Sequence, residues 1–348
     1  MTQLAAVTDR HRFDVGRLTD YLASALPGFA APLDVQQFQG GQSNPTYLLR
    51  TDVATYVMRS KPGPVAKLLP SAHAIEREYR VMRALGEQGF PVPRMLLLCE
   101  DESVIGRAFF LMQHVEGRIL WDQSLPGLDS AARAALYDEM NRVIAALHSV
   151  DVSAAGLSDF GKAGNYFARQ IGRWSRQYQA SATESVEAMD QLIEWLPAHV
   201  PPGDESAVVH GDFRLDNLIF HPAEPRIIAV IDWELATLGH PLADFSYHCM
   251  SWHIPAGLYR GIGGLDLDAL GIPKEADYVR RYCERTGRAA IAHWDFYIAY
   301  NLFRIAAILQ GVYKRGTEGL ASSDKALEHG RNARVLGELG WRYAQQAG

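Results

Sequence analysis

Long apolar runs and paired cysteines are both absent from this chain of 348 residues. Its longest apolar runs, such as 108–112 and 227–231, cover about five residues, whereas a membrane-spanning helix needs about 20. The three cysteines, Cys99, Cys249 and Cys283, lie far apart and form no CxxC pair. We therefore expect no membrane span, no disulfide framework and no cysteine-based zinc site.

Strong positive charge is also lacking. No basic run exceeds two residues and the formal net charge is −6, so nothing in the sequence indicates nucleic-acid binding. Residues 1–115 carry 12 basic and 11 acidic side chains, whereas residues 116–348 carry 22 and 29. This acidic second part is compatible with a cationic substrate, and ordinary solubility charge explains it equally well. Asp9 and Arg10 stand where a signal peptide would be apolar, so we expect a cytoplasmic protein.

The composition that remains is that of a folded globular protein. Hydrophobic residues make up 48% of the chain and charged residues 21%, close to the usual proportions. The length suggests about two domains. The sequence also changes character near residue 115, where strand patterns give way to helical ones.

The first part reads as a small α/β unit. Residues 47–49 and 56–58 flank a polar turn and predict a hairpin, and residues 95–99 and 109–115, separated by the polar stretch 100–103, predict a second hairpin. A helix is expected from Ser71 to Leu85, before the stop signals Gly86 and Gly89.

The second part reads as mostly helical. Apolar residues recur at helical spacing within 136–147 and 297–308. Between these regions, short strands are expected at 208–209, 218–220 and 227–231. The fold class we predict is α+β with two unequal lobes, and a ligand cleft between them.

The chemistry concentrates in the strand-rich island of the second part. It contains the segment HGDFRLDN at 210–217 and IDWE at 231–234. Asp212 and Asn217 have the same spacing as the aspartate and asparagine of the kinase signature H-R-D-x-x-x-x-N, and Asp232 takes the place of the DFG aspartate. One carboxylate can accept the proton of an attacking hydroxyl, while the amide and the second carboxylate hold Mg²⁺. A pair of polar turns is the competing interpretation of each motif taken alone.

These segments, together with GHPLAD at 239–244, resemble the aminoglycoside phosphotransferase and choline kinase family. The resemblance extends to residues 38–44, 59–69 and 301–315. Residues 59–83 and 301–315 are most similar to a subgroup whose animal relatives are fused to acyl-CoA dehydrogenase domains. The resemblance implies a bilobal, protein-kinase-like fold. The N-terminal nucleotide-binding lobe, residues 1–115, would hold an antiparallel sheet and one main helix. A hinge at about 112–117 would lead to a larger catalytic and substrate-binding lobe, residues 116–348.

The resemblance also implies which residues bind the nucleotide. The loop with Gly40, Gly41, Ser43 and Asn44 matches the family's phosphate-covering loop, and its glycines let backbone N–H groups approach phosphate oxygens. Arg59 takes the place of the usual strand lysine, and an arginine can hold a phosphate bidentately. Lys61 is a second candidate, but Pro62 argues against a strand that continues so far.

Further nucleotide contacts follow from the helix and the hinge. Glu78 shares an apolar helical stripe with Met82 and Leu85, and a glutamate there needs a buried cationic partner. We therefore predict that Glu78 pairs with Arg59, and that Glu76 stays in solvent. The resemblance implies that adenine binds the backbone of Gln113 and Val115.

Several nearby polar residues are expected to act as supports. His210 is predicted to be structural because Asp212 already occupies the position of the base. Asp216 and Glu234 are assigned to caps or to supporting contacts, and Asp244 resembles the family's aspartate that braces the catalytic loop. Arg304 is either a buried, paired arginine or a contact for an anionic substrate.

Taken together, the sequence predicts an ATP- and Mg²⁺-dependent kinase of small molecules. Asp212 is the predicted catalytic base, and Asn217 and Asp232 are the predicted metal ligands. The subgroup resemblance suggests a hydroxyacyl thioester as acceptor. The alternatives are an aminoglycoside or another small hydroxyl compound, and a catalytically inactive kinase-like protein that binds nucleotide.

Overall fold

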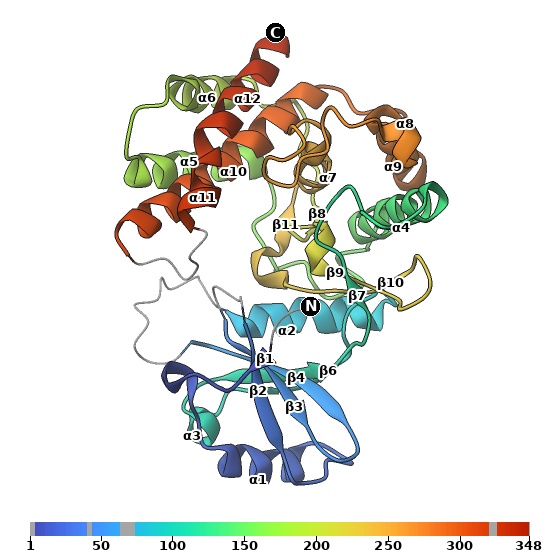
Figure 1. The fold of residues 1–348 in the computed structure, drawn as a ribbon, viewed down its shortest axis with the longest axis vertical. Coiled ribbons are helices and arrows are strands. Elements are labelled where there is room, and N and C mark those ends of the chain that lie inside the picture. Colours follow the sequence, from blue (N-terminus) through green and yellow to red (C-terminus); the bar gives the residue numbers. More distant parts are fainter. Residues whose placement is uncertain (1–3, 40–43, 63–73, 320–325, 348) are drawn as a thin grey trace.

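The computed structural model describes residues 4–39, 44–62, 74–319 and 326–347. Within them, the first part of the chain forms an antiparallel sheet with the strand order β1-β2-β3-β4-β6-β5 (Figure 1). Its strands are β1 (Leu4–Ala5), β2 (Asp34–Phe38), β3 (Thr46–Arg50), β4 (Thr55–Ser60), β5 (Met95–Cys99) and β6 (Phe109–Gln113). The predicted hairpin is β3–β4, and β5 pairs with β6 as expected.

Successive residues of these strands bury opposite faces of the sheet. Leu48 and Val57 pack with helix α2 (Ile75–Glu87), whereas Leu49 and Met58 pack with helix α1 (Val15–Ala25). Figure 1 shows the two helices on opposite sides of the sheet. The sequence predicted one main helix in this part, and α1 is an addition to that prediction. It covers a sheet face that would otherwise expose apolar side chains to water.

The second part of the chain is mostly helical. Its longer helices are α4 (Ser130–His148), α5 (Tyr166–Ser181), α6 (Glu187–Ala198), α7 (Pro241–Cys249), α9 (Glu275–Thr286), α10 (Trp294–Thr317) and α12 (Asn332–Gln346). Shorter ones are α3 (Glu102–Ile105) in the first part, and α8 (Leu267–Leu270) and α11 (Ala326–Gly330) in the second. The helical patterns at 136–147 and 297–308 lie in α4 and α10, as predicted. Among the described residues, no helix combines the length and the apolar character needed to cross a bilayer.

The strand-rich island forms two small sheets rather than one. One sheet has the order β10-β9-β7 and the other pairs β11 with β8. Their strands are β7 (Arg118–Ile119), β8 (Ala207–Val209), β9 (Leu218–Phe220), β10 (Ile227–Val230) and β11 (Thr237–Gly239). Strands β8 and β9 belong to different sheets, so the segment 210–217 that joins them crosses from one sheet to the other. This segment carries polar side chains of the predicted active site.

The connection between the two parts is short and tightly packed. Strand β6 ends at Gln113, before the predicted end at 115, and β7 already pairs with β9. Gly117 is required in between, because a Cβ there would lie 2.4 Å from the carbonyl oxygen of Phe220. The fold is therefore the predicted α+β, kinase-like arrangement. The division into lobes at residues 115 and 116 stays a prediction.

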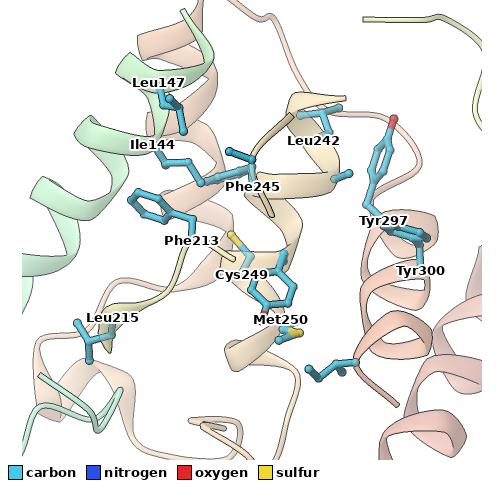
Figure 2. Close-up of a cluster of buried hydrophobic side chains, with 14 of the residues drawn as sticks. Ile144, Leu147, Phe213, Leu215, Leu242, Phe245, Cys249, Met250, Tyr297 and Tyr300 are labelled. Carbon is cyan, nitrogen blue, oxygen red and sulfur yellow. The ribbon is translucent and has the colours of Figure 1, made fainter. Parts of the chain in front are cut away.

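Aromatic side chains fill the centre of the helical part. Phe245 on α7 is fully buried and stacks on Tyr282 of α9, with ring centroids 3.7 Å apart. Figure 2 shows Phe245 pointing toward Ile144 and Leu147 of α4. This cluster holds α4, α7 and α9 around the segment that carries the predicted active site.

We expect Phe245→Ala to lower the free energy of unfolding by about 3–5 kcal/mol, because it removes a large buried ring and leaves a cavity. Urea unfolding followed by circular dichroism measures this change. The control Trp121→Ala removes an aromatic ring that is 56% exposed, and its effect should stay within about 0.5 kcal/mol. Equal effects of the two variants would contradict the assignment of Phe245 to the core.

Candidate active site

A buried carboxylate holds the segment 210–217 in place. Asp244, on α7, accepts hydrogen bonds of 2.8 Å from the backbone N–H groups of both His210 and Gly211. His148 lies 3.3 Å away on its other side. Burial is the largest single influence and would raise the pKa of Asp244, but the hydrogen bonds and charge interactions with His148 and His210 together outweigh it, and the pKa is lowered. Asp244 therefore braces the loop as a charged carboxylate, as the sequence suggested.

The turn at Gly211 needs glycine for two reasons. Its φ is +80°, and a Cβ there would lie 2.8 Å from the carbonyl oxygen of Leu235. Its carbonyl accepts a hydrogen bond from Arg304, which is buried on α10. The guanidinium of Arg304 also lies over the ring of Tyr247, 4.7 Å from the centroid. Of the two roles considered for Arg304, the structure supports the buried structural one.

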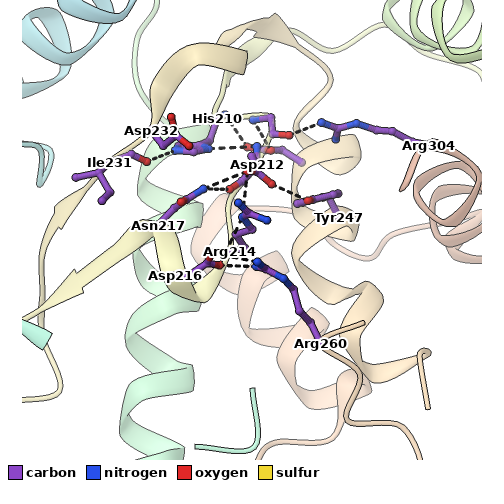
Figure 3. A network of polar contacts seen from close by, with 12 residues as sticks. His210, Asp212, Arg214, Asp216, Asn217, Ile231, Asp232, Tyr247, Arg260 and Arg304 are labelled. Carbon is purple, nitrogen blue, oxygen red and sulfur yellow. Dashed lines mark hydrogen bonds and ion pairs between the residues drawn. The ribbon is translucent and has the colours of Figure 1, made fainter. Parts of the chain in front are cut away.

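Asp212 is the centre of the polar network in Figure 3. Its Oδ1 accepts a hydrogen bond of 2.6 Å from the hydroxyl of Tyr247. Its Oδ2 lies 3.2 Å from the amide nitrogen of Asn217 and 3.0 Å from Nε of Arg214. Both carboxylate oxygens are thus oriented by groups from α7 and from the loop itself, so the side chain has one preferred direction.

Asn217 and Asp232 are brought together by backbone contacts. The N–H of Ile231 donates to the carbonyl of Asn217 at 3.0 Å, and Nε2 of His210 lies 3.0 Å from the carbonyl of Ile231. The N–H of Asp212 donates to Nδ1 of His210, so Nε2 carries the proton and donates to Ile231. His210 therefore ties the two loops together, in agreement with its predicted structural role.

Asp232 itself adopts an uncommon backbone conformation, with φ +67°. A residue other than glycine in this region stores about 1–3 kcal/mol of strain and is found mainly at functional sites. Burial is the largest single influence and raises the pKa of its carboxyl, but the charge and hydrogen bond of Arg59, together with the charges of His210 and Arg214, outweigh it, and the pKa is lowered. The fold thus holds Asp232 charged and in a fixed direction.

Arg59 on β4 joins three carboxylates. Its Nε lies 3.1 Å from Glu78 on α2, and one terminal amino group lies 2.9 Å from Asp232 and 3.3 Å from Glu234. The predicted Arg59–Glu78 pair is confirmed. Burial of Glu78 raises the pKa of its carboxyl to about 7, even though Arg59 opposes this shift.

The prediction that Glu76 stays in solvent is wrong. Its carboxylate forms an ion pair with Lys61, and both side chains are about one third exposed. The N–H of Lys61 still donates to the carbonyl of Ala108, the next pair after Ser60 and Phe109. Lys61 therefore lies on the same side of the chain as Arg59, two residues earlier, and both side chains reach glutamates of α2. Arg80 pairs with Asp159 and Arg83 with Glu87.

The other predicted nucleotide contacts are placed only in part. Gly40, Gly41 and Ser43 lie outside the described residues. The amide nitrogen of Asn44 donates to Glu78 at 2.9 Å, so Asn44 helps to hold the carboxylate that orients Arg59. The N–H of Gln113 donates to the carbonyl of Arg94. The carbonyl of Gln113 and the backbone of Val115 therefore stay the predicted adenine contacts.

Three contacts of the site escaped the sequence analysis. Tyr247 is 35 residues from Asp212, and its only sequence signal is its place one helical turn after Asp244. Arg214 lies inside the motif, and its position between Asp212 and Asp216 could have indicated its role. Glu234 was assigned only a supporting role, although it reaches Arg59.

A small pocket lies next to Asp212. It is partly open to solvent, its space is about 300 Å³ when this open part is included, and Arg214, Tyr247, Tyr259 and Arg260 are among its lining residues. Two of these, Arg214 and Tyr247, contact Asp212 directly. A ligand in this pocket would therefore lie beside the carboxylate of Asp212.

Comparison with known proteins gives consistent matches. The model of the phosphotransferase enzyme family (APH) matches residues 34–297. A solved structure from Ralstonia eutropha JMP134, provisionally described as an aminoglycoside phosphotransferase, is 58% identical. It aligns over 96% of this chain and 99% of its own, with a TM-score of 0.89. The aminoglycoside phosphotransferase APH(4)-Ia, in complex with AMP-PNP and hygromycin B, has a TM-score of 0.61 over 94% of this chain and 98% of its own. At 17% identity, this second likeness concerns the fold alone.

Longer animal proteins also match. Acyl-CoA dehydrogenase family member 10 of Mus musculus is 49% identical over 91% of this chain, and member 11 of Rattus norvegicus is 42% identical over 98%. The chain spans only 30% and 44% of these two relatives. Since the family model covers most of the chain and a relative at 58% identity aligns along nearly its full length, this chain belongs to the phosphotransferase enzyme family.

Proposed function

We propose that this chain transfers the γ-phosphate of ATP to a hydroxyl group of a small molecule, with Mg²⁺ bound at the same site. This proposal rests on one observation: Asp212, Asn217 and Asp232 lie close together. They stand on two loops that hydrogen bonds to the backbone hold together. Their order and spacing match the catalytic base and the metal ligands of kinases.

The charge of the site supports a bound cation. Glu78, Asp232 and Glu234 share the single guanidinium of Arg59, which leaves an excess of negative charge when all three are ionised. Asp232 and Asn217 offer the oxygen ligands that Mg²⁺ prefers. We propose that these two residues hold the ion, which when bound neutralises charge on the phosphates.

The protein's own residues then position the reactants. Asp212 orients the acceptor hydroxyl and accepts its proton, and Tyr247 keeps the carboxylate in the required direction. Arg59, held by Glu78 and Asn44, contacts the phosphates in place of the usual lysine. Most of the rate enhancement therefore comes from positioning and from charge neutralisation.

We propose the same division of labour between lobes as the sequence suggested. Residues 1–115 bind the nucleotide through the loop with Gly40, Gly41 and Ser43 and through the backbone of Gln113 and Val115. Residues 116–348 carry the catalytic groups and the acceptor pocket. The pairing of β7 with β9 directly after β6 supports a hinge at about 112–117.

The acceptor we propose is a hydroxyacyl thioester. The support is the alignment of 98% of this chain with a relative named as an acyl-CoA dehydrogenase family member, since a thioester is the substrate that this name implies. An aminoglycoside is the second candidate, because APH(4)-Ia has been solved with hygromycin B. A phosphate-transfer screen with radiolabelled ATP across hydroxyacyl-CoAs, aminoglycosides, sugars and amino alcohols tests both.

A catalytically inactive, nucleotide-binding protein is the alternative from another class. Such proteins usually lack the base or a metal ligand, whereas Asp212, Asn217 and Asp232 are all present here. Slow ATP hydrolysis without any acceptor would favour the enzyme, and its complete absence together with tight ATP binding would favour the inactive protein.

Asp212→Asn should lower kcat by roughly 100- to 10,000-fold and leave the affinity for Mg·ATP unchanged, because it removes the base and no metal ligand. Turnover assays and calorimetric titration with AMP-PNP measure the two quantities. The matched control Asp20→Asn, on the exposed face of α1, should behave as the wild type. A near-normal kcat for Asp212→Asn would overturn the assignment.

Asp232→Asn should weaken binding of Mg·AMP-PNP by at least about 10-fold, since changes around metal ligands already cost about 10- to 100-fold in affinity. Titration in the presence and absence of Mg²⁺ separates the metal-dependent part. The prediction fails if the variant shows the same gain in nucleotide affinity on addition of Mg²⁺ as the wild type.

Glu78→Gln should change how stability depends on pH. Folded Glu78 keeps its proton up to about pH 7, whereas its ordinary pKa is 4.5, so the folded state binds more protons between these values. The wild type therefore loses stability from this group as the pH rises from about 4.5 to about 7, and the variant should lack that decline. Urea unfolding at pH 5 and pH 7.5 measures it.

The matched control for this prediction is Glu76→Gln on the same helix, whose carboxylate lies outside the buried cluster. It should keep the wild-type difference between the two pH values. Glu78→Gln should also bind ATP more weakly than Glu76→Gln, because Arg59 loses the partner that orients it. Identical pH profiles for wild type and Glu78→Gln would contradict the burial argument.

A further inference from the structure

The pocket beside Asp212 is positively charged, although residues 116–348 carry more acidic than basic side chains. Two guanidinium groups, those of Arg214 and Arg260, line it, and none of its described lining residues is a carboxylate. His248, also in the lining, is buried, and this lowers its pKa to about 4, so it is neutral at physiological pH. The positive charge of the lining is thus confined to the two arginines.

Arg214 presents unused hydrogen-bond donors to this pocket. Its Nε faces Asp212 at 3.0 Å and Asp216 at 3.5 Å. Its two terminal amino groups form no hydrogen bond with any described residue. Figure 3 shows its side chain between Asp212 and the ion pair of Asp216 with Arg260. The Nε of Arg214 is buried and, although close to both carboxylates, has no hydrogen-bond partner among the described residues. A guanidinium whose donors are free of hydrogen bonds is suited to bind an anionic group.

Arg260 is held in place by a strained and closely packed loop. Its φ is +62°, a conformation that residues other than glycine rarely adopt. The next residue, Gly261, admits no side chain, because a Cβ there would lie 2.2 Å from the carbonyl oxygen of Ile254. Asp216 then binds both terminal amino groups of Arg260. Strain that the surrounding packing maintains in this way is typical of functional positions.

Arg214 and Arg260 are each paired with a carboxylate of the catalytic segment, Asp212 and Asp216 respectively. Neither carboxylate is among the lining residues of the pocket, so the two guanidiniums are the charged groups that an acceptor bound there would meet.

We propose that Arg214 and Arg260 form the acceptor's recognition site, and that the acceptor carries a carboxylate or phosphate group which these two guanidiniums bind. This inference rests on the proposed phosphotransfer and names the class of acceptor. The anionic group is either the carboxylate of a free hydroxy acid or a phosphate of the carrier to which the hydroxyacyl group is esterified. Polycationic acceptors such as aminoglycosides are disfavoured, because they would meet two arginines and no lining carboxylate.

The test is calorimetric titration of the wild-type protein in the presence of Mg·AMP-PNP with four probes. They are 3-hydroxybutyrate, 3-hydroxybutyryl-CoA, neutral 1,3-butanediol and polycationic kanamycin. We expect binding of at least one of the two anionic probes and weaker binding of the diol and of kanamycin. Which anionic probe binds more tightly distinguishes the free carboxylate from the carrier phosphate.

Variants of Arg260 connect this binding to the pocket. Arg260→Gln should weaken binding of the preferred anionic probe by roughly 10- to 100-fold and leave affinity for the diol unchanged. Arg260→Lys keeps the charge without the planar fork and should fall between the two. The matched control Arg280→Gln, on the exposed face of α9, should bind all four probes as the wild type does.

The outcomes separate this inference from the proposed function. Three results would each overturn the anion site. They are equal or tighter binding of kanamycin or of the diol, unchanged anion binding by Arg260→Gln, and no binding of either anionic probe. Phosphorylation of kanamycin or of the diol in the wild type would then still support the phosphotransferase. Anion binding that Arg260→Gln abolishes, without phosphate transfer to any probe, supports the anion site and counts against the catalytic proposal.

Discussion

One guanidinium determines how the two parts of this molecule fit together at the active site. Arg59 projects from β4 and contacts Glu78 on α2 and both Asp232 and Glu234 after β10. A buried cation of this kind is stable only with charged partners close by, and buried carboxylates are costly without a cation. The sheet, the helix α2 and the loop after β10 therefore hold one another in register through a single side chain.

The helical part of the chain serves mainly as a frame for one short loop. Asp244 on α7 binds two backbone N–H groups of that loop, Tyr247 on the same helix orients Asp212, and Arg304 on α10 binds the carbonyl of Gly211. The stacking of Phe245 on Tyr282 packs this helix against α9. Groups held in this way need little reorganisation during a reaction, which is how positioning contributes to catalysis.

The net charge of residues 116–348 and the charge of the pocket beside Asp212 suggest different kinds of acceptor. Residues 116–348 carry more acidic than basic side chains, which by itself is compatible with a cationic acceptor. The pocket beside Asp212 is nevertheless lined by two arginines. Net charge describes the average surface, whereas recognition depends on the few groups that face the ligand. The pocket is therefore the better guide to the acceptor.

Much of this architecture could be predicted from sequence, because it depends on local periodicity. Two short apolar runs on either side of a polar turn identified β3 and β4, and the helical stripe placed Glu78 rather than Glu76 against Arg59. The spacing of Asp212, Asn217 and Asp232 identified the candidate site, and no structural information was needed for it.

Other features depend on contacts between residues that are distant in sequence, and these were decided only by the tertiary structure. Helix α1 was not expected, and neither was the ion pair of Glu76 with Lys61. Tyr247 reaches Asp212 across 35 residues, and Arg260 reaches Asp216 across 44. A sequence pattern records which face of an element is buried. Which partner a long polar side chain finds depends on how the elements pack, and local periodicity carries no information about that.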